Sequence, residues 1–229
     1  MTRYGFRLAL GAFFHAETET LLKQLPAALH PVETHPGIAV VAVTVFDFDR
    51  SEVGAYGELV VSAVVAPYLG EGLALPDAAL FPLMLATTTP ESRTHAAERW
   101  HLPHFDRCVS IAFDEGRPSS LGPRSVEVHD RDELVLRLEV EAQAREQATR
   151  HYQCFSASPD AIHRVEIDIG GPLTEHEDER GQLSLGASPL GAAIAALIDD
   201  PLPLREQVMD AGEQRFGSLV RHAPLRRPA

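Results

Sequence analysis

Two Val-rich segments separated by a polar turn constrain the fold of this chain more than any other feature. They cover residues 37–49 (GIAVVAVTVFDFD) and 56–65 (YGELVVSAVV), and the turn lies at residues 50–54. β-Branched residues at this density favour strands, and two such runs joined by a short polar turn favour an antiparallel hairpin. The sequence therefore predicts a hydrophobic β-hairpin early in the chain.

The rest of the chain also favours strands over helices. Turn residues recur about every ten to twenty positions, and strands and helices do not alternate regularly. We expect further strands at residues 8–14, 80–87, 108–113, 134–140, 149–155, 163–169 and 216–220. Short helices are expected at residues 17–25, 92–101 and 189–198. The fold class is therefore mainly β (α+β), as a mostly antiparallel barrel or sandwich with a few short peripheral helices.

Length and composition are those of one ordinary globular domain. The 229 residues are 45% hydrophobic and 23% charged, and no boundary divides them, so we expect a single domain over 1–229. The net charge of −13, from 33 acidic and 20 basic residues, argues against nucleic acid and anionic membranes as partners. No segment reaches the roughly 18 to 20 apolar residues that span a bilayer.

The two cysteines and the N-terminal segment bear on the cellular compartment. Cys108 and Cys154 are far apart and show no CxxC spacing, so we expect neither a zinc site nor a disulfide. Residues 8–14 loosely resemble a signal peptide, but they run into His15 and Glu17 without a small-residue cleavage site. These features predict a soluble, cytoplasmic protein.

Several blocks occur in a distinctive order along the whole chain. Arg7 is followed by LLKQLP at 21–26, by the two Val-rich segments and by Gly-Ala-Tyr-Gly-Glu at 54–58. AERWHLPHF at 97–105 and a stretch of small residues, a helix and Leu-Pro at 183–203 come later. This ordered set resembles the acetoacetate decarboxylase-like superfamily. The block at 54–58 is similar to that superfamily's Gly-x-Tyr-x-Glu signature.

The resemblance implies a closed β cone around a buried pocket, with Glu58 pointing into it, no cofactor, and assembly as a homo-oligomer. An apolar, partly uncovered strand surface at residues 81–85 favours the same assembly. The lysine that forms the imine with a keto acid in the family corresponds here to His104. The family's second pocket glutamate corresponds to Val43 or Thr44, neither of which is acidic.

An imine requires a neutral primary amine, which imidazole cannot supply. The only lysine in the chain is Lys23, which lies on a predicted helix among exposed positions. Its pKa should therefore stay too high for a nucleophile. The sequence predicts chemistry without a Schiff base.

Three residues are candidates for the chemistry, each with an alternative role. Strand alternation puts Glu58 on the same face as Tyr56 and Val60, so it is either a desolvated acid/base group or an outward carboxylate. Arg7 either binds a substrate carboxylate or forms an ion pair with an acid such as Glu58. His104 either transfers protons or fills the volume of the missing lysine.

Other polar clusters have simpler explanations. His95, His101, His104 and Asp106 lack a recognisable metal-ligand spacing, so we expect no metal site. Residues 175–180 (EHEDER) are expected to form a solvated loop. Ser156 and Ser158 belong to no recognisable nucleophile motif.

These observations predict a lysine-independent enzyme that uses acid/base catalysis on a small keto-acid or polyketide-like substrate, by decarboxylation, dehydration or cyclisation. Glu58 and His104 would be catalytic, while Arg7, Tyr56 and Trp100 would bind the substrate. By analogy with relatives of this type, the pathway would belong to specialised metabolism. The alternative is a non-catalytic small-molecule-binding protein, or pseudoenzyme, on the same barrel.

Overall fold

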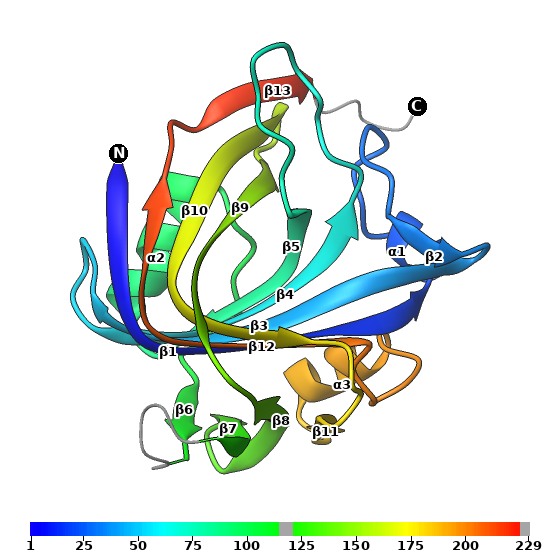
Figure 1. The fold of residues 1–229 in the computed structure, drawn as a ribbon. Helices are drawn as coiled ribbons and strands as arrows, with labels where there is room; N and C mark the ends of the chain where they lie inside the picture. Colours follow the sequence, from blue (N-terminus) through cyan, green and yellow to red (C-terminus); the bar gives the residue numbers. More distant parts are fainter. Residues whose placement is uncertain (115–120, 225–229) are drawn as a thin grey trace.

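The computed structural model describes residues 1–114 and 121–224, and its main element is a closed seven-stranded β-barrel (Figure 1). The strands run around the barrel in the order β1-β12-β10-β9-β5-β4-β3, and pairing of β1 with β3 closes the ring. All neighbours are antiparallel except β5 and β9. The seven strands are β1 (Thr2–Glu17), β3 (Ile38–Arg50), β4 (Tyr56–Val65), β5 (Ala78–Thr87), β9 (Glu146–Ala157), β10 (Ala161–His176) and β12 (Arg205–Phe216).

A smaller sheet packs against the outside of this barrel. Its order is β11 (Gln182–Leu185), β8 (Glu133–Ala142), β7 (Gly122–Asp130) and β6 (Ser110–Phe113), and it lies below the barrel in Figure 1. Two short strands extend the barrel: β2 (Glu33–His35) pairs with β3, and β13 (Val220–Pro224) pairs with β10. The helices of the described residues are α1 (Thr18–Leu22), α2 (Pro90–Trp100) and α3 (Pro189–Ala195).

The main hydrophobic core lies between the barrel wall and the smaller sheet. Side chains alternate along each strand, so every second residue of β3 and β4 faces outward. Val43 and Leu59 face outward and are buried in one cluster with Val126 and Leu138 of the smaller sheet. The intervening residues face the barrel interior. This two-sided burial explains why β3 and β4 are almost continuously apolar in sequence.

Helix α2 has a well-defined start and end. The Thr89 hydroxyl accepts a hydrogen bond from the Ser92 amide at 3.2 Å, and Pro90 occupies the first turn. The helix ends at His101, which adopts a left-handed conformation with φ of 52°. This ending turns the chain so that Leu102 lines the barrel interior.

Most predicted elements are present, and the fold class is confirmed as a closed, mainly β barrel with short helices. The predicted hairpin is formed by β3 and β4. The strand predicted at 216–220 is wrong, because the chain forms β12 before it and β13 after it. The predicted helix at 17–25 is shorter, since β1 continues to Glu17 and the helix spans only Thr18–Leu22.

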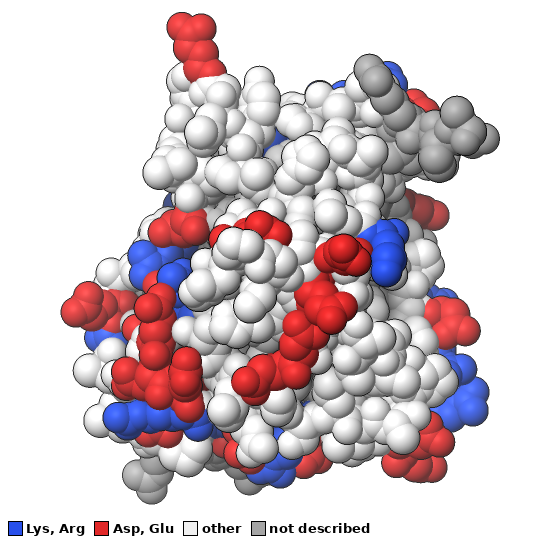
Figure 2. All heavy atoms as spheres, turned by 90° about the vertical axis from the view of Figure 1, so that its right-hand side faces the viewer, with Lys and Arg blue, Asp and Glu red and all other residues white. Residues whose placement is uncertain are grey.

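Three further findings concern the surface and its surroundings. Phe81 and Leu85 are buried while Leu83 and Met84 are half-buried, so the apolar surface at 81–85 is partly uncovered as expected, and homo-oligomerisation stays a prediction. No helix in the described parts of the chain is long and apolar enough to cross a membrane. Figure 2 shows acidic side chains in a diagonal row across a largely uncharged face, in keeping with the net charge of −13.

Candidate functional site

The barrel encloses a cavity of about 140 Å³. Its walls are mostly apolar and include Phe46, Leu85 and Ile167. Polar side chains also line it, namely Thr44, Glu58, Ser62, Tyr152, Cys154, Gln207 and Gln214. In the described part of the chain, no lysine or arginine lines this cavity. This cavity is partly open to solvent, and a small cavity with a few polar groups is the usual form of a small-molecule site.

Glu58 is the one carboxylic acid that lines the cavity among the described residues. It lies on β4 opposite Phe46 of β3, facing inward as Val60 does. Burial in these apolar surroundings raises the pKa of the Glu58 carboxyl to about 7, and the Tyr56 hydroxyl, which donates to Oε2 at 3.4 Å, opposes this only in part. Glu58 is therefore able to take up and release a proton near neutral pH.

A chain of hydrogen bonds lies outside the cavity lining, where Trp100 packs against the lining residue Phe216. The Tyr4 hydroxyl accepts from Trp100 Nε1 at 3.1 Å and lies 2.6 Å from His95 Nε2. Burial lowers the pKa of His95, which favours the neutral form of its ring. His95 lies 3.6 Å from Glu52, whose side chain is 49% exposed.

Two of the predicted site residues are held close to the cavity without lining it. Tyr56 is buried, packs against Phe48 with ring centroids 5.0 Å apart, and contacts Glu58. Trp100 is buried against Phe216, a cavity-lining residue, with ring centroids 4.9 Å apart. Both side chains support the walls of the site.

The structure does not bring Arg7 and His104 to the cavity. The Arg7 side chain is 65% exposed and forms a two-pronged ion pair with Asp47, at 2.8 Å from Nε and 2.7 Å from Nη2. His104 is exposed on the outside, beside Leu190 of α3. The predicted convergence of Arg7, Glu58 and His104 is therefore wrong. A bulge between Phe6 and Leu8 displaces the pairing at Arg7, and the left-handed end of α2 directs Leu102 inward in place of His104.

The structure also places Lys23 and the two residues at which a second pocket acid was expected. Lys23 is exposed just after α1, as expected, so the only lysine of the chain lies outside the cavity. Thr44 faces the cavity, whereas Val43 faces the hydrophobic core. Of the two residues that the resemblance offered for this position, only Thr44 lines the cavity, and it carries a hydroxyl.

Sequence reasoning missed several cavity residues. Tyr152 and Cys154 lie on a strand that was predicted, and alternation alone would have put them on one face. Gln207 and Gln214 lie on β12, whose charged sequence gave no strand signal. Burial raises the pKa of the Cys154 thiol to about 12, so this thiol is neutral at physiological pH.

The histidines do not gather into one cluster. His95 is bonded to Tyr4, while the His101 ring lies against His163 with centroids 4.7 Å apart. No group of three His, Cys, Asp or Glu side chains suited to a metal ion occurs in residues 1–114 and 121–224.

The fold of this chain is shared with solved proteins over nearly its whole length. Acetoacetate decarboxylase from Legionella pneumophila subsp. pneumophila str. Philadelphia 1 matches with a TM-score of 0.70 at 11% identity, over 98% of this chain and 88% of that one. The enduracididine biosynthesis enzyme MppR, complexed with the condensation product of pyruvate and imidazole 4-carboxaldehyde, matches with a TM-score of 0.68 at 13% identity, over 96% and 89%.

An acetoacetate decarboxylase-like enzyme from Sphingomonas wittichii RW1 matches with a TM-score of 0.59 at 16% identity, over 98% of this chain and 94% of that one. No protein-family model matches the sequence, and no curated protein matches it. The chain therefore has the acetoacetate decarboxylase-like fold, which confirms at the level of the fold the resemblance found in the sequence blocks.

Proposed function

We propose that this protein is an enzyme that transfers a proton at the carbon next to the carbonyl group of a small, uncharged oxo compound. Glu58 acts as the base that removes the proton and then as the acid that returns one. The enol formed between these steps can be reprotonated, can lose a leaving group or can close a ring. The observation that carries the proposal is a carboxyl group with a pKa of about 7 lining an apolar cavity.

The pKa of Glu58 suits this task. An acid/base catalyst works best when its pKa lies near the working pH, because both protonation states are then populated. Such a group typically contributes about 10² to 10⁴-fold to the rate. An ordinary surface glutamate is fully ionised at neutral pH and is a much weaker base.

The lining of the cavity favours an uncharged substrate over a keto acid. A carboxylate buried beside ionised Glu58 would be repelled, and no lysine or arginine among the described lining residues offsets that cost. A related structure holds MppR complexed with pyruvate, so the fold accommodates small oxo acids in that protein. A keto acid therefore belongs in any test as the competing substrate class.

The carbonyl oxygen requires a hydrogen-bond donor as charge develops on it. Gln214 lines the cavity, and its side-chain amide makes no hydrogen bond to any described residue. We assign the Gln214 amide nitrogen as this donor. An imine is not part of the mechanism, because Lys23 is exposed and does not line the cavity, and no other lysine occurs in the sequence.

The proposal is tested by exchange of α-protons with solvent deuterium. The protein is incubated in D₂O with 2-butanone or with pyruvate, and loss of the α-proton signals is followed by NMR. We expect catalysed exchange of 2-butanone and slower exchange of pyruvate. Glu58→Gln should lower the rate by roughly 10² to 10⁴-fold. Glu19→Gln, a change at an exposed residue of α1, serves as the matched control.

Two outcomes would count against this proposal. Exchange that is unaffected by Glu58→Gln would exclude Glu58 as the base. Binding of 2-butanone without any catalysed exchange would favour the non-catalytic binding protein that the sequence left open.

A further inference from the structure

The barrel lining has a gap at Gly11. This position lies next to the level of Glu58 along the strands. Gly11 of β1 pairs with Thr44 of β3 on one side and with Gln207 of β12 on the other, and all three line the cavity. A Cβ atom placed on Gly11 would lie 3.5 Å from Thr44 Oγ1 and 3.6 Å from Gln207 Oε1. The two oxygens therefore border the same space, which the absent side chain leaves open.

The orientation of the Gln207 side-chain amide follows from its hydrogen bond to Glu175. Nε2 donates to Glu175 Oε2 at 2.5 Å and lies 3.4 Å from the Tyr152 hydroxyl. A carboxylate only accepts hydrogen bonds, so the nitrogen must face Glu175 and Oε1 must face away from it. The amide thus presents an acceptor toward the cavity.

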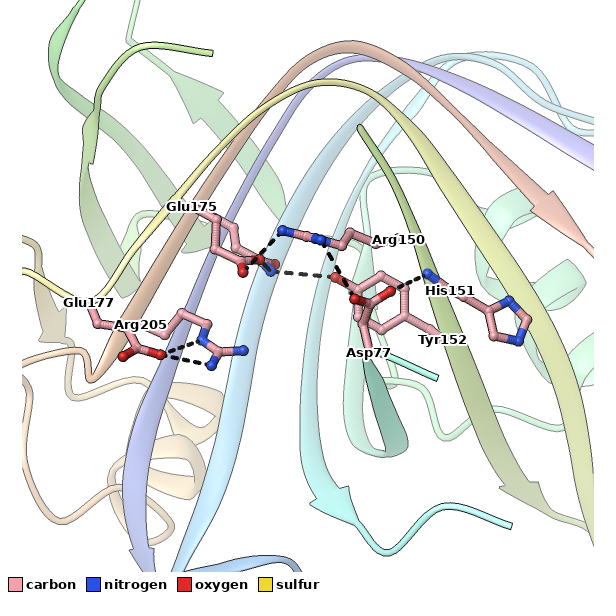
Figure 3. A network of polar contacts seen from close by, with 8 residues as sticks. Asp77, Arg150, His151, Tyr152, Glu175, Glu177 and Arg205 are labelled. Atoms are coloured by element: carbon pink, nitrogen blue, oxygen red, sulfur yellow. Dashed lines mark hydrogen bonds and ion pairs between the residues drawn. The ribbon is translucent and has the colours of Figure 1, made fainter. Parts of the chain in front are cut away.

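A network of ion pairs fixes this orientation (Figure 3). Arg150 lies between Glu175 and Asp77, at 3.2 Å and 3.6 Å respectively. Asp77 in turn accepts from the His151 amide at 2.7 Å. Because the Glu175 carboxylate is committed to Arg150 and Gln207, the Gln207 side chain is held in one arrangement.

Neither oxygen has a hydrogen-bond partner among the described residues. Over the described residues, Thr44 Oγ1 makes no hydrogen bond, and Gln207 bonds only through its nitrogen. Both side chains are half-buried and line the cavity, so a ligand can reach them. The Gln207 oxygen accepts a hydrogen bond, while the Thr44 hydroxyl can donate or accept one, which suits a ligand group that does both. A hydroxyl fits best, since the described lining residues at this level offer no free carboxylate to balance an ammonium ion.

We propose that Thr44 Oγ1 and Gln207 Oε1 form a subsite that binds a hydroxyl group of the ligand. Thr44 lies diagonally across from Glu58 on the neighbouring strand, a separation of about 7 to 8 Å between such positions. After allowance for a hydrogen bond at each end, only a few carbon atoms separate the reacting carbon from the hydroxyl. The substrate class is therefore a small hydroxylated ketone, such as a β-hydroxy ketone. This choice of class rests on the proposed function, whereas the hydroxyl subsite does not.

The test compares 4-hydroxy-2-butanone with 2-butanone, which differ only in the hydroxyl. Binding of each probe is titrated by ligand-observed NMR. The wild-type protein should bind the hydroxylated probe more tightly by roughly three- to ten-fold, the range of one or two modest hydrogen bonds. Thr44→Val and Gly11→Ala should each abolish most of this preference while leaving binding of 2-butanone nearly unchanged.

The variants are chosen so that the fold survives. Valine has the shape of threonine, and the new methyl group at position 11 makes only ordinary contacts at 3.5 and 3.6 Å. Ile167→Val, a change in the apolar lining, is the matched control and should keep the preference.

The outcomes separate the subsite from the proton-transfer chemistry. Equal binding of both probes to the wild type, or a preference that survives both Thr44→Val and Gly11→Ala, would overturn the subsite. So would a failure of either probe to bind at tens of millimolar. A clear hydroxyl preference with no α-proton exchange of either probe would support the subsite and reject the proposed enzyme function.

Discussion

Replacement of Glu58 by glutamine should change how the stability of the protein depends on pH. The pKa of Glu58 is raised from 4.5 to about 7 in the folded chain, so between these values the folded state binds more protons than the unfolded state. The free energy of unfolding that this group contributes is therefore fully present below pH 4.5 and falls as the pH rises to about 7. Above that pH, the folded protein carries the full cost of a buried carboxylate.

The size of this effect follows from the shift. One pKa unit corresponds to about 1.4 kcal/mol, so a shift from 4.5 to about 7 amounts to at most about 3.5 kcal/mol. Water in the cavity would screen part of the charge and reduce this figure. For a chain of this length, the corresponding difference in melting temperature is at most roughly 7 to 14 °C.

The assay is urea unfolding of the wild type and Glu58→Gln at a series of pH values from 4.5 to 8. Groups such as His95, whose pKa is lowered by burial, titrate identically in both proteins and cancel in the difference. Glu58→Gln should gain stability relative to the wild type as the pH rises, and the gain should level off above about pH 7. Parallel curves over the whole range would show that Glu58 is not desolvated, and the reasoning would fail.

Three further predictions concern other parts of the molecule. Glu206→Ala should lower the free energy of unfolding by about 3 kcal/mol or more, as measured by urea unfolding. The Glu206 carboxylate is 1% exposed and accepts hydrogen bonds from the backbone amides of Glu141, Arg180 and Gly181. A loss of less than about 1 kcal/mol would refute this role. Cys154 should resist iodoacetamide at pH 7.5 until the chain unfolds, since its thiol has a pKa of about 12, and rapid labelling of the native protein would contradict its burial. Incubation with acetoacetate and borohydride should leave the intact mass unchanged, and an adduct would show that a lysine-dependent imine forms.

The barrel strands with the clearest alternation could be predicted from sequence. β3 and β4 are rich in Val because both of their faces are buried, and the Gly-x-Tyr-x-Glu block correctly put Glu58 on the inward face. β12 could not be predicted in the same manner. It carries Glu206 and Asp210, which are buried with hydrogen-bonding or ion-pair partners from elsewhere in the chain, such as Arg145. A charged strand of this kind cannot be recognised from sequence alone, because the partners of its buried side chains are brought to it only by the fold.

The candidate site was predictable only in part for a related reason. The family resemblance indicated Arg7 and His104, but the directions of their side chains depend on a bulge in β1 and on the left-handed end of α2, neither of which follows from periodicity. Thr44 and Gln207 approach each other across Gly11 through pairings between strands that are distant in sequence. Such a subsite requires the closed barrel before it can be recognised.

The most direct test of the central claim, that Glu58 is the acid/base group of the cavity, is the pH profile of α-proton exchange with 2-butanone. The base form must be ionised, so the rate should rise with pH and reach half of its plateau near pH 7, in line with the raised pKa. In Glu58→Gln both the rate and this transition should be lost. A half-point near pH 4.5, or an unchanged profile in Glu58→Gln, would contradict the claim.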